Sequence, residues 1–246
     1  MSFIMFPKGF YRDKNGELNV QGIKIDALTA KYGTPLFIYD TGLMKERYEV
    51  FLNTVKKVKG NIHYAVKAND SVNIIKFFGK LGAGADIVSI GEFQKCVAAG
   101  ISPKKIIFSG VGKNNDEIEI ALRNNILQFN IESEEELYDI YDIANKLKIN
   151  ANICLRINPD IAPNTHKKIS TGEKETKFGI DSEKIIAIYK KLHELDYINP
   201  YGLGVHIGSQ IFDFSFFQKA YSYLKWIADD LKNSGYNVPA LDLGGG

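Results

Sequence analysis

Seven short apolar runs alternate with helical stretches along most of the chain, and this alternation constrains the fold more than any other feature. The runs lie at residues 62–66, 84–88, 105–109, 127–131, 152–157, 201–207 and 240–245. Strands separated by helices indicate βαβ units, whose strands lie parallel in one sheet. The chain has 246 residues, which is enough for an α/β barrel with a full core.

A polar residue or a glycine lies at or just past the carboxyl end of each run. These residues are Lys67, Asp86, Ser109, Asn130, Arg156, His206 and Gly244. In a (β/α)8 TIM-type barrel all such ends converge on one face, where the active site is built. An open, doubly wound sheet would gather its chemistry at one switch point instead. Contributions from all seven runs favour the barrel, with about seven of its eight strands present.

The alternation of side chains predicts which way these residues point. On the first run, Lys67 shares its face with Ala65 and His63, and on the sixth run His206 shares its face with two glycines. The faces that carry the polar residues are otherwise small, whereas the opposite faces are bulky. We therefore expect the bulky faces to meet the helices and Lys67 to point into the barrel mouth.

The first forty residues follow a different pattern. Asn15-Gly16 lies between β-prone flanks, which predicts a tight hairpin with both turn residues at positive φ. A short helix is expected over residues 26–33, with Asp26 as its N-cap and Gly33 after its last turn. Residues 36–40 are expected to form a strand. The predicted organisation is a β segment over residues 1–40, which would join a second β-domain, and a barrel over residues 41–246.

Composition argues against several classes of protein. The chain has 31 basic and 29 acidic residues and no basic run, which is not typical of a nucleic-acid-binding protein. The sequence contains no run of eighteen apolar residues, so it predicts no membrane span, and its first residues do not have the pattern of a signal peptide. Cys96 and Cys154 lack the spacing of metal ligands, so no metal is expected, and two cysteines in a chain of this size favour the cytoplasm.

An inward-pointing lysine suggests covalent chemistry, although a solvated lysine at a strand end is the commoner case. A lysine that loses hydration presents its neutral, nucleophilic amine, and such lysines form Schiff bases with carbonyl substrates or with pyridoxal phosphate. The glycines Gly244, Gly245 and Gly246 can present backbone N–H groups to a phosphate. His206 can lie flat against a heteroaromatic ring or be an ordinary strand-end histidine. Together these residues favour a pyridoxal-phosphate site.

Five stretches resemble the barrel-type (fold-type III) pyridoxal-phosphate enzymes, the group of alanine racemase and the eukaryotic ornithine decarboxylases. Within that group the chain is most similar to the diaminopimelate decarboxylases. The stretches are YAVKAN (64–69), GAGADIVSIGEF (82–93), RINPDIAPNTHKKISTGEKETKFGI (156–180), GVHIGSQI (204–211) and LDLGGG (241–246). The third stretch is the most specific, because the first and the last are shared across the whole group.

The resemblance implies roles for individual residues. Lys67 matches the lysine that holds the cofactor as a Schiff base, and His206 matches the histidine stacked on its ring. Ser209 and the three glycines match groups that bind the phosphate. Asp86, Glu92 and Arg156 match polar residues that line the site. The implied reaction is the decarboxylation of meso-diaminopimelate to L-lysine, in an enzyme expected to be a homodimer.

The same resemblance implies parts that this sequence does not contain. Family members continue with an eighth barrel strand, a Glu-Pro-Gly-Arg segment and a β-domain that carries a proton-donor cysteine. The chain is therefore expected to be the N-terminal portion of the enzyme, poorly stable or self-associating, and inactive by itself. The loop from Pro159 to Gly179 is expected to lie over the barrel mouth and to shape the diaminopimelate pocket.

Two alternatives stay open at this point. One is a related decarboxylase of ornithine, arginine or carboxynorspermidine, against which the THKKISTG segment argues. The other is a non-catalytic, single-barrel pyridoxal-phosphate-binding protein of the homeostasis type. That type should close its own barrel, whereas this sequence shows seven strands.

Overall fold

The computed structural model describes residues 8–159 and 178–245. The chain divides into two compact units, Met1–Ile62 and His63–Gly246, and each is described by itself. The domain boundary expected between residues 40 and 41 stays a prediction. Among the described residues, no helix has both the length and the apolar character that a membrane-spanning helix needs.

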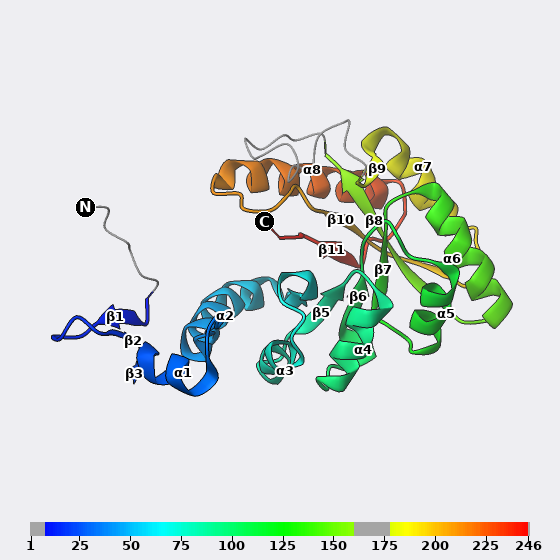
Figure 1. Ribbon diagram of the computed structural model, residues 1–246. Coiled ribbons are helices and arrows are strands. Elements are labelled where there is room, and N and C mark those ends of the chain that lie inside the picture. Colours follow the sequence, from blue (N-terminus) through cyan, green and yellow to red (C-terminus); the bar gives the residue numbers. More distant parts are fainter. Residues whose placement is uncertain (1–7, 160–177, 246) are drawn as a thin grey trace. The chain divides into compact units, whose positions relative to one another are not determined.

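The first unit contains a small antiparallel sheet and two α-helices (Figure 1). Its elements are β1 (Phe10–Arg12), β2 (Leu18–Val20), β3 (Ile23–Lys24), α1 (Ile25–Tyr32), α2 (Thr41–Val55) and the short 3-10 helix η1 (Lys56–Val58). Strands β1 and β2 pair antiparallel, with Phe10 opposite Val20, so the predicted hairpin is confirmed.

The turn of this hairpin differs from the prediction. Gly16 has a φ of 81°, but Asn15 does not have a positive φ. The connection is organised by Asp13, whose carboxylate accepts hydrogen bonds from the backbone N–H groups of Asn15 and Glu17 at 2.9 and 3.0 Å. An aspartate that binds the backbone ahead of it stabilises a longer turn, which here needs one left-handed residue and not two.

Two other expectations for this unit were wrong. Helix α1 begins at Ile25 after its N-cap Lys24, so Asp26 lies inside the first turn and does not cap the helix. Residues 36–40 form no strand, because no described strand pairs with them and an unpaired strand leaves its backbone groups without hydrogen bonds. Asp40 caps α2 instead, and its carboxylate accepts the N–H of Leu43 at 3.0 Å.

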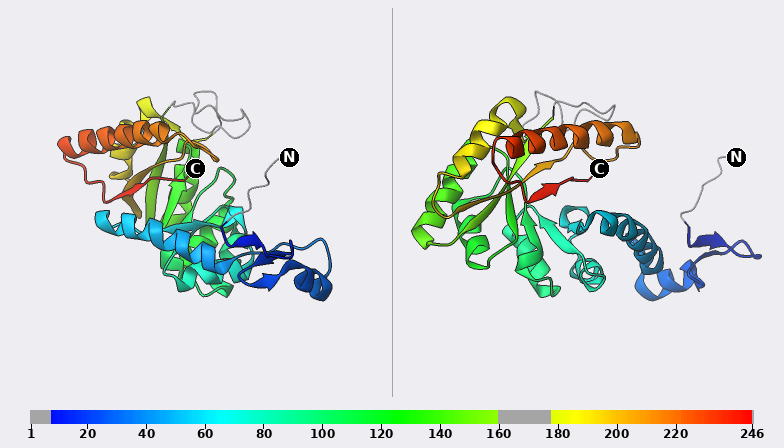
Figure 2. Two further views of the ribbon diagram at one scale, coloured as in Figure 1. Left: turned by 90° about the vertical axis from the view of Figure 1, so that its left-hand side faces the viewer. Right: turned by 180° about the vertical axis from the view of Figure 1, so that it is seen from behind.

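The second unit is a curled parallel sheet with helices along its outer side (Figures 1 and 2). The strands lie in the order β4-β5-β6-β7-β8-β10-β11, and the short strand β9 pairs with β8 off this path. All of these pairings are parallel. The order of the strands in space follows their order in the chain. This confirms the predicted α/β class and a barrel-type sheet that contains seven of the eight strands of a (β/α)8 barrel.

Seven of the strands of this unit coincide with the apolar runs of the sequence, and the short strand β9 was not predicted. They are β4 (His63–Ala65), β5 (Gly84–Ile87), β6 (Ile106–Phe108), β7 (Gln128–Ile131), β8 (Ala151–Asn158), β9 (Ile180–Asp181), β10 (Ile198–Val205) and β11 (Ala240–Asp242). The helices are η2 (Val66–Ala68), α3 (Val72–Lys80), α4 (Ile90–Ala98), η3 (Pro103–Lys105), α5 (Asn115–Arg123), α6 (Glu134–Leu147), α7 (Ser182–Leu192) and α8 (Phe214–Asn233).

Two local features explain why these elements form. Along the strands, bulky apolar residues that pack toward the helices alternate with polar or small residues on the inner face of the sheet. Several helices begin at a side-chain cap: Ser89, Asn114 and Ser133 each accept the backbone N–H of the residue three positions later. These caps fix where each helix leaves the carboxyl end of its strand, and therefore fix the loops around the site.

The two faces of the sheet differ as the alternation predicts. On the outer face, Val66 is fully buried and Tyr64 stacks on Phe78 of α3, with 4.5 Å between ring centroids. On the inner face of β10, a Cβ at Gly204 would lie 3.2 Å from the Cβ of Asp242 and 3.4 Å from the Sγ of Cys154. The inner face of β10 is therefore held to a residue without a Cβ at Gly204, which leaves room for the neighbouring Asp242 side chain.

Candidate active site

The polar residues singled out in the sequence lie at the carboxyl ends of the seven strands. Asp86, Asn130 and Arg156 lie within β5, β7 and β8, whereas the others follow the ends of their strands by one or two residues. Because parallel strands present their carboxyl ends at the same edge, these residues share one end of the sheet. Hydrogen bonds and charge interactions connect them into the groups described below.

The first group is a chain of hydrogen bonds across the inner face of the sheet. The Ser109 hydroxyl donates to Asp86 Oδ1 at 2.6 Å. The Asn130 amide donates to Ser109 Oγ at 3.0 Å and to Asp242 Oδ2 at 2.7 Å. In the order of the sheet, β7 and β11 are separated by β8 and β10, so the bond from Asn130 to Asp242 spans the concave side of the curl.

The second group is a buried ion pair. Arg156 Nη1 lies 2.7 Å from Glu132 Oε1, and the side chains are 12% and 2% exposed. The other oxygen of Glu132 accepts the backbone N–H of Gly179 at 3.1 Å, and the Arg156 guanidinium lies over the ring of Phe178. Glu132 therefore fixes Arg156 and also the backbone that leads into β9.

Lys67 lies beside these groups but not on a strand. The sequence predicts Lys67 at the end of the first strand. That strand, β4, stops at Ala65, and Lys67 belongs to the 3-10 turn η2 that follows it. Its side chain is exposed among the described residues, so they do not form the enclosure expected to strip its hydration. Its ammonium is close enough to Asp86, Glu92 and His206 to act on the pKa of each.

Asp86 and Glu92 both hold their protons more tightly than usual. Burial and, to a smaller extent, the charge of Asp242 raise the pKa of Asp86 to about 7, against the lowering effects of the Ser109 hydrogen bond and of the charges of Lys67 and Arg156. Burial also raises the pKa of Glu92, whose carboxylate accepts the N–H of Val88 at 2.8 Å. Asp86 is therefore present in both protonation states near neutral pH.

His206 is neutral over the physiological range. Burial, the largest cause, and the positive charges of Arg156 and Lys67 together lower its pKa to about 3. Its carbonyl oxygen is 3.5 Å from Arg156 Nη2, and its Nδ1 is 3.4 Å from the backbone N–H of Gly245. Ser209 is half-buried in the segment after β10, three residues beyond His206.

The glycine turn after β11 is shaped by close contacts. Gly244 has a φ of 65°, and a Cβ there would collide with the carbonyl oxygen of Val205. Its N–H donates to Asp242 Oδ1 at 2.9 Å. A Cβ on Gly245, in contrast, would meet no described atom within 4 Å. The predicted contribution of Gly246 lies outside the described residues.

Two residues of the site were not found from the sequence. Glu132 and Asp242 make the contacts that connect the strand ends, but neither ends a strand in the predicted pattern. The signal was available, because Glu132 is two residues after Asn130 and Asp242 is two residues before Gly244. Residues two apart in extended chain share a face, so both should have been placed inside the barrel.

These residues fit a pyridoxal phosphate. An exposed amine at Lys67, a neutral imidazole at His206 and a glycine turn with open space at Gly245 supply a covalent anchor, a flat surface and a place for a phosphate. The described residues contain no cluster of acidic, histidine or cysteine side chains that could hold a metal ion. The loop expected over the barrel mouth lies outside the described residues except at its ends.

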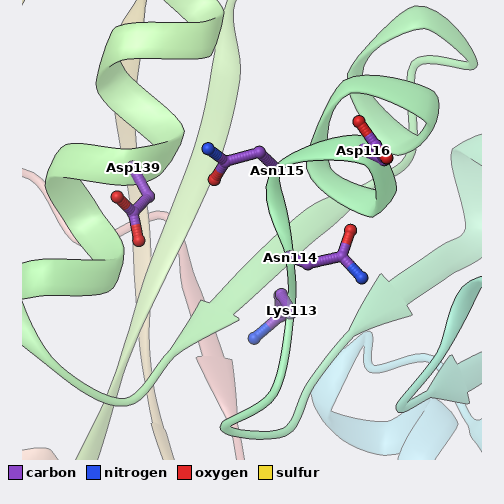
Figure 3. A pocket seen from close by; sticks show the side chains of 5 residues that line it. All are labelled: Lys113, Asn114, Asn115, Asp116 and Asp139. Carbon is purple, nitrogen blue, oxygen red and sulfur yellow. The ribbon is translucent and has the colours of Figure 1, made fainter.

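A hollow elsewhere on the surface does not belong to this site. Figure 3 shows the five residues that line it, Lys113, Asn114, Asn115, Asp116 and Asp139. The Lys113 ammonium donates to the carbonyl oxygens of Gly110 and Asn130 and to Glu136, and its side chain is fully buried. Asn114 caps α5. The polar groups here serve the fold and offer no reactive group.

A parallel barrel-type sheet with a lysine, a neutral histidine and a glycine turn at its carboxyl edge defines a cofactor-binding domain of the pyridoxal class. Residues 41–246 match the family described as "Pyridoxal-dependent decarboxylase, pyridoxal binding domain", and the chain belongs to this family. Pyridoxal phosphate is therefore its cofactor.

Similar proteins agree with this assignment. The chain is 43% identical to the diaminopimelate decarboxylase of Zymomonas mobilis over 95% of its own length and 56% of that protein. It is 40% identical to the enzyme of the same name from Aquifex aeolicus, over 96% and 55%. The chain thus spans about half the length of the curated relatives that it matches.

Solved structures show the same fold. A diaminopimelate decarboxylase from Helicobacter pylori, complexed with L-lysine, superposes with a TM-score of 0.87 at 40% identity, over 90% of this chain and 56% of that one. The enzyme from M. jannaschii, also in complex with L-lysine, gives a TM-score of 0.88 at 34% identity, over 96% and 57%. Both confirm the arrangement of strands described here.

Proposed function

We propose that the protein is a diaminopimelate decarboxylase. It removes carbon dioxide from meso-2,6-diaminopimelate and releases L-lysine, as a step of lysine biosynthesis, and this chain supplies the pyridoxal-phosphate-binding portion. The observation that carries the proposal is the similarity over nearly the whole chain to decarboxylases of this name, at up to 43% identity. Two similar structures contain L-lysine, which is the product of this reaction.

The residues of the chain have distinct tasks in this proposal. Lys67 anchors the cofactor through its amine, His206 supports the ring with a neutral face, and the turn at Gly244 and Gly245 receives the phosphate. Bound pyridoxal phosphate acts as an electron sink for the pair left behind when a carboxylate departs as carbon dioxide. With a pKa of about 7, Asp86 can take up or return a proton near the Lys67 amine at neutral pH.

Glu132 and Arg156 keep the strand ends in place around these groups. The pair joins β7 to β8, and its contacts to Gly179 and to the His206 carbonyl reach the next segments on either side. Such support matters because catalytic groups act efficiently only when their geometry is held within a fraction of an ångström. Homodimeric assembly and a cytoplasmic location are further parts of the proposal.

The experiment is a substrate comparison on the complete enzyme, of which this chain supplies the cofactor-binding portion, loaded with pyridoxal phosphate. Carbon dioxide and L-lysine should form from meso-diaminopimelate, with little release from L-ornithine, L-arginine or carboxynorspermidine. Faster release from one of those three would replace the proposal with a related decarboxylase. A loaded protein that decarboxylates none of the four would support the non-catalytic, cofactor-binding alternative.

A further inference from the structure

Two side chains, Asp242 and Asn130, connect the glycine turn to the inner face of the sheet. Asp242 accepts the Gly244 N–H with one oxygen, at 2.9 Å, and the Asn130 amide with the other, at 2.7 Å. Asn130 is 112 residues away in sequence and comes from β7. The backbone N–H of Gly244 therefore points at a carboxylate of its own chain.

We propose that Asn130 and Asp242 are positioning residues that set the glycine turn for the phosphate of the cofactor. They act through the direction of the Gly244 peptide and not by touching the phosphate. The inference deepens the cofactor site and rests on the pyridoxal-binding assignment, not on the choice of diaminopimelate as substrate.

The orientation of the Asn130 amide is fixed from two sides. Its Oδ1 accepts a hydrogen bond from Gln128 Nε2 at 2.8 Å, and both side chains are buried. Its amide group must then face Ser109 and Asp242, because amide and carbonyl ends cannot be exchanged without placing two donors together. Asn130 thus holds the Asp242 carboxylate in one place, and Asp242 holds Gly244.

The substitution Asp242→Asn distinguishes a positioning role of Asp242 from a purely electrostatic effect of its charge on the phosphate. A carboxylate near a phosphate repels it, so on charge alone the change Asp242→Asn should tighten phosphate binding. On the positioning argument the same change weakens it. An asparagine has one acceptor oxygen where Asp242 uses two, so its NH2 group must face a donor, either the Gly244 N–H or the Asn130 amide.

The test compares two ligands on the apo protein: pyridoxal 5′-phosphate and pyridoxal, which lacks the phosphate. Binding is followed by absorbance for Asn130→Ala and Asp242→Asn. Loss of a hydrogen bond to a charged group corresponds to about a tenfold effect, so each variant should bind the phosphorylated ligand about tenfold more weakly. Affinity for pyridoxal should change less than about twofold.

The matched control is Asn152→Ala. Asn152 also bridges neighbouring segments, through the Leu127 carbonyl and the Asn199 amide, both at 2.7 Å, but it lies near the start of β8, away from the glycine turn. It should leave the ratio of the two affinities unchanged. Circular dichroism checks folding, and Asn130→Ser, which keeps a small polar side chain, replaces Asn130→Ala if that variant does not fold.

Three results would overturn the inference. Equal losses for both ligands would mean that the pair only supports the fold. Unchanged affinity for pyridoxal phosphate would mean that the turn does not depend on it. Tighter binding by Asp242→Asn would show that charge repulsion outweighs positioning. None of these binding measurements involves an amino-acid substrate. If the wild type binds pyridoxal phosphate normally, a failure of this inference can therefore be told apart from a wrong choice of diaminopimelate as substrate.

Discussion

The Glu132 carboxylate lies 2.7 Å from the Arg156 guanidinium, and its side chain is 2% exposed. The pair joins the carboxyl ends of the neighbouring strands β7 and β8. The Glu132 carboxylate also accepts a hydrogen bond from the Gly179 N–H. A buried charge that has lost its partner carries a large desolvation penalty, so this pair matters most when one member is removed.

The first prediction concerns this pair. Glu132→Ala leaves the Arg156 guanidinium without its carboxylate, and we expect the free energy of unfolding to fall by about 3–5 kcal/mol. Denaturant unfolding of the apo protein measures it. The control is Glu134→Ala, two residues away, whose pair with Lys191 is 3.2 Å long and largely exposed, so its loss should change stability little. Equal effects of the two substitutions would contradict the prediction.

The second prediction is that Lys67 is the covalent attachment point. Reduction of the cofactor-loaded protein with borohydride should leave a pyridoxyl group on the peptide that contains Lys67. Lys113 serves as an internal reference, because its ammonium is buried and already donates three hydrogen bonds. Mass spectrometry of the digest locates the label, and a label on any other lysine would show that the assignment is wrong.

The third prediction uses the contrast between two adjacent glycines. Gly245→Val adds a side chain where the protein has open space, so the fold should keep its stability while affinity for pyridoxal phosphate falls. Gly244→Ala forces a Cβ against the Val205 carbonyl and strains a residue at a φ of 65°, so it should lower the unfolding temperature. Thermal unfolding and cofactor titration separate the two effects.

This comparison also has a clear negative outcome. If Gly245→Val binds pyridoxal phosphate as the wild type does, the phosphate does not approach this turn. The turn would then be only a connection after β11.

The sequence predicts the strand ends of this site well, because a parallel sheet leaves little freedom. Once the apolar runs are accepted as strands of one parallel sheet, Asp86, Asn130 and Arg156 must lie at the same edge. It does not predict which of them bind one another. The bond from Asn130 to Asp242 depends on how strongly the sheet curls, and that curl arises from packing along all strands.

The N-terminal differences have a more local cause. The hairpin turn depends on the Asp13 carboxylate, which competes with the two-residue turn that Asn15-Gly16 favours. Residues 36–40 have the composition of a strand, but composition cannot supply a partner strand. The exposure of Lys67 likewise depends on which segments cover the mouth, and alternation along one strand contains no information on that point.

The last prediction is a pH dependence due to Asp86. Its pKa is raised to about 7 in the folded protein, so between its unfolded value and pH 7 the folded state binds more protons than the unfolded state. The resulting stabilisation is complete at low pH and is lost as pH rises through about 7. Asp86→Asn mimics the protonated form and can still accept the Ser109 hydroxyl, so it should not lose this contribution.

Measuring the free energy of unfolding of both proteins from pH 5 to pH 8 tests this. His206 has a lowered pKa, so it makes both proteins more stable as pH rises toward its unfolded value, and taking the difference between them removes its effect. Relative to Asp86→Asn, the wild type should lose about 3 kcal/mol over this range, since the folded and unfolded states differ in bound protons over roughly the two pH units from 5 to about 7, and each such unit corresponds to about 1.4 kcal/mol. A difference that stays constant, or that grows in favour of the wild type at high pH, would mean that Asp86 is ionised throughout and that Lys67 and Arg156 outweigh its burial.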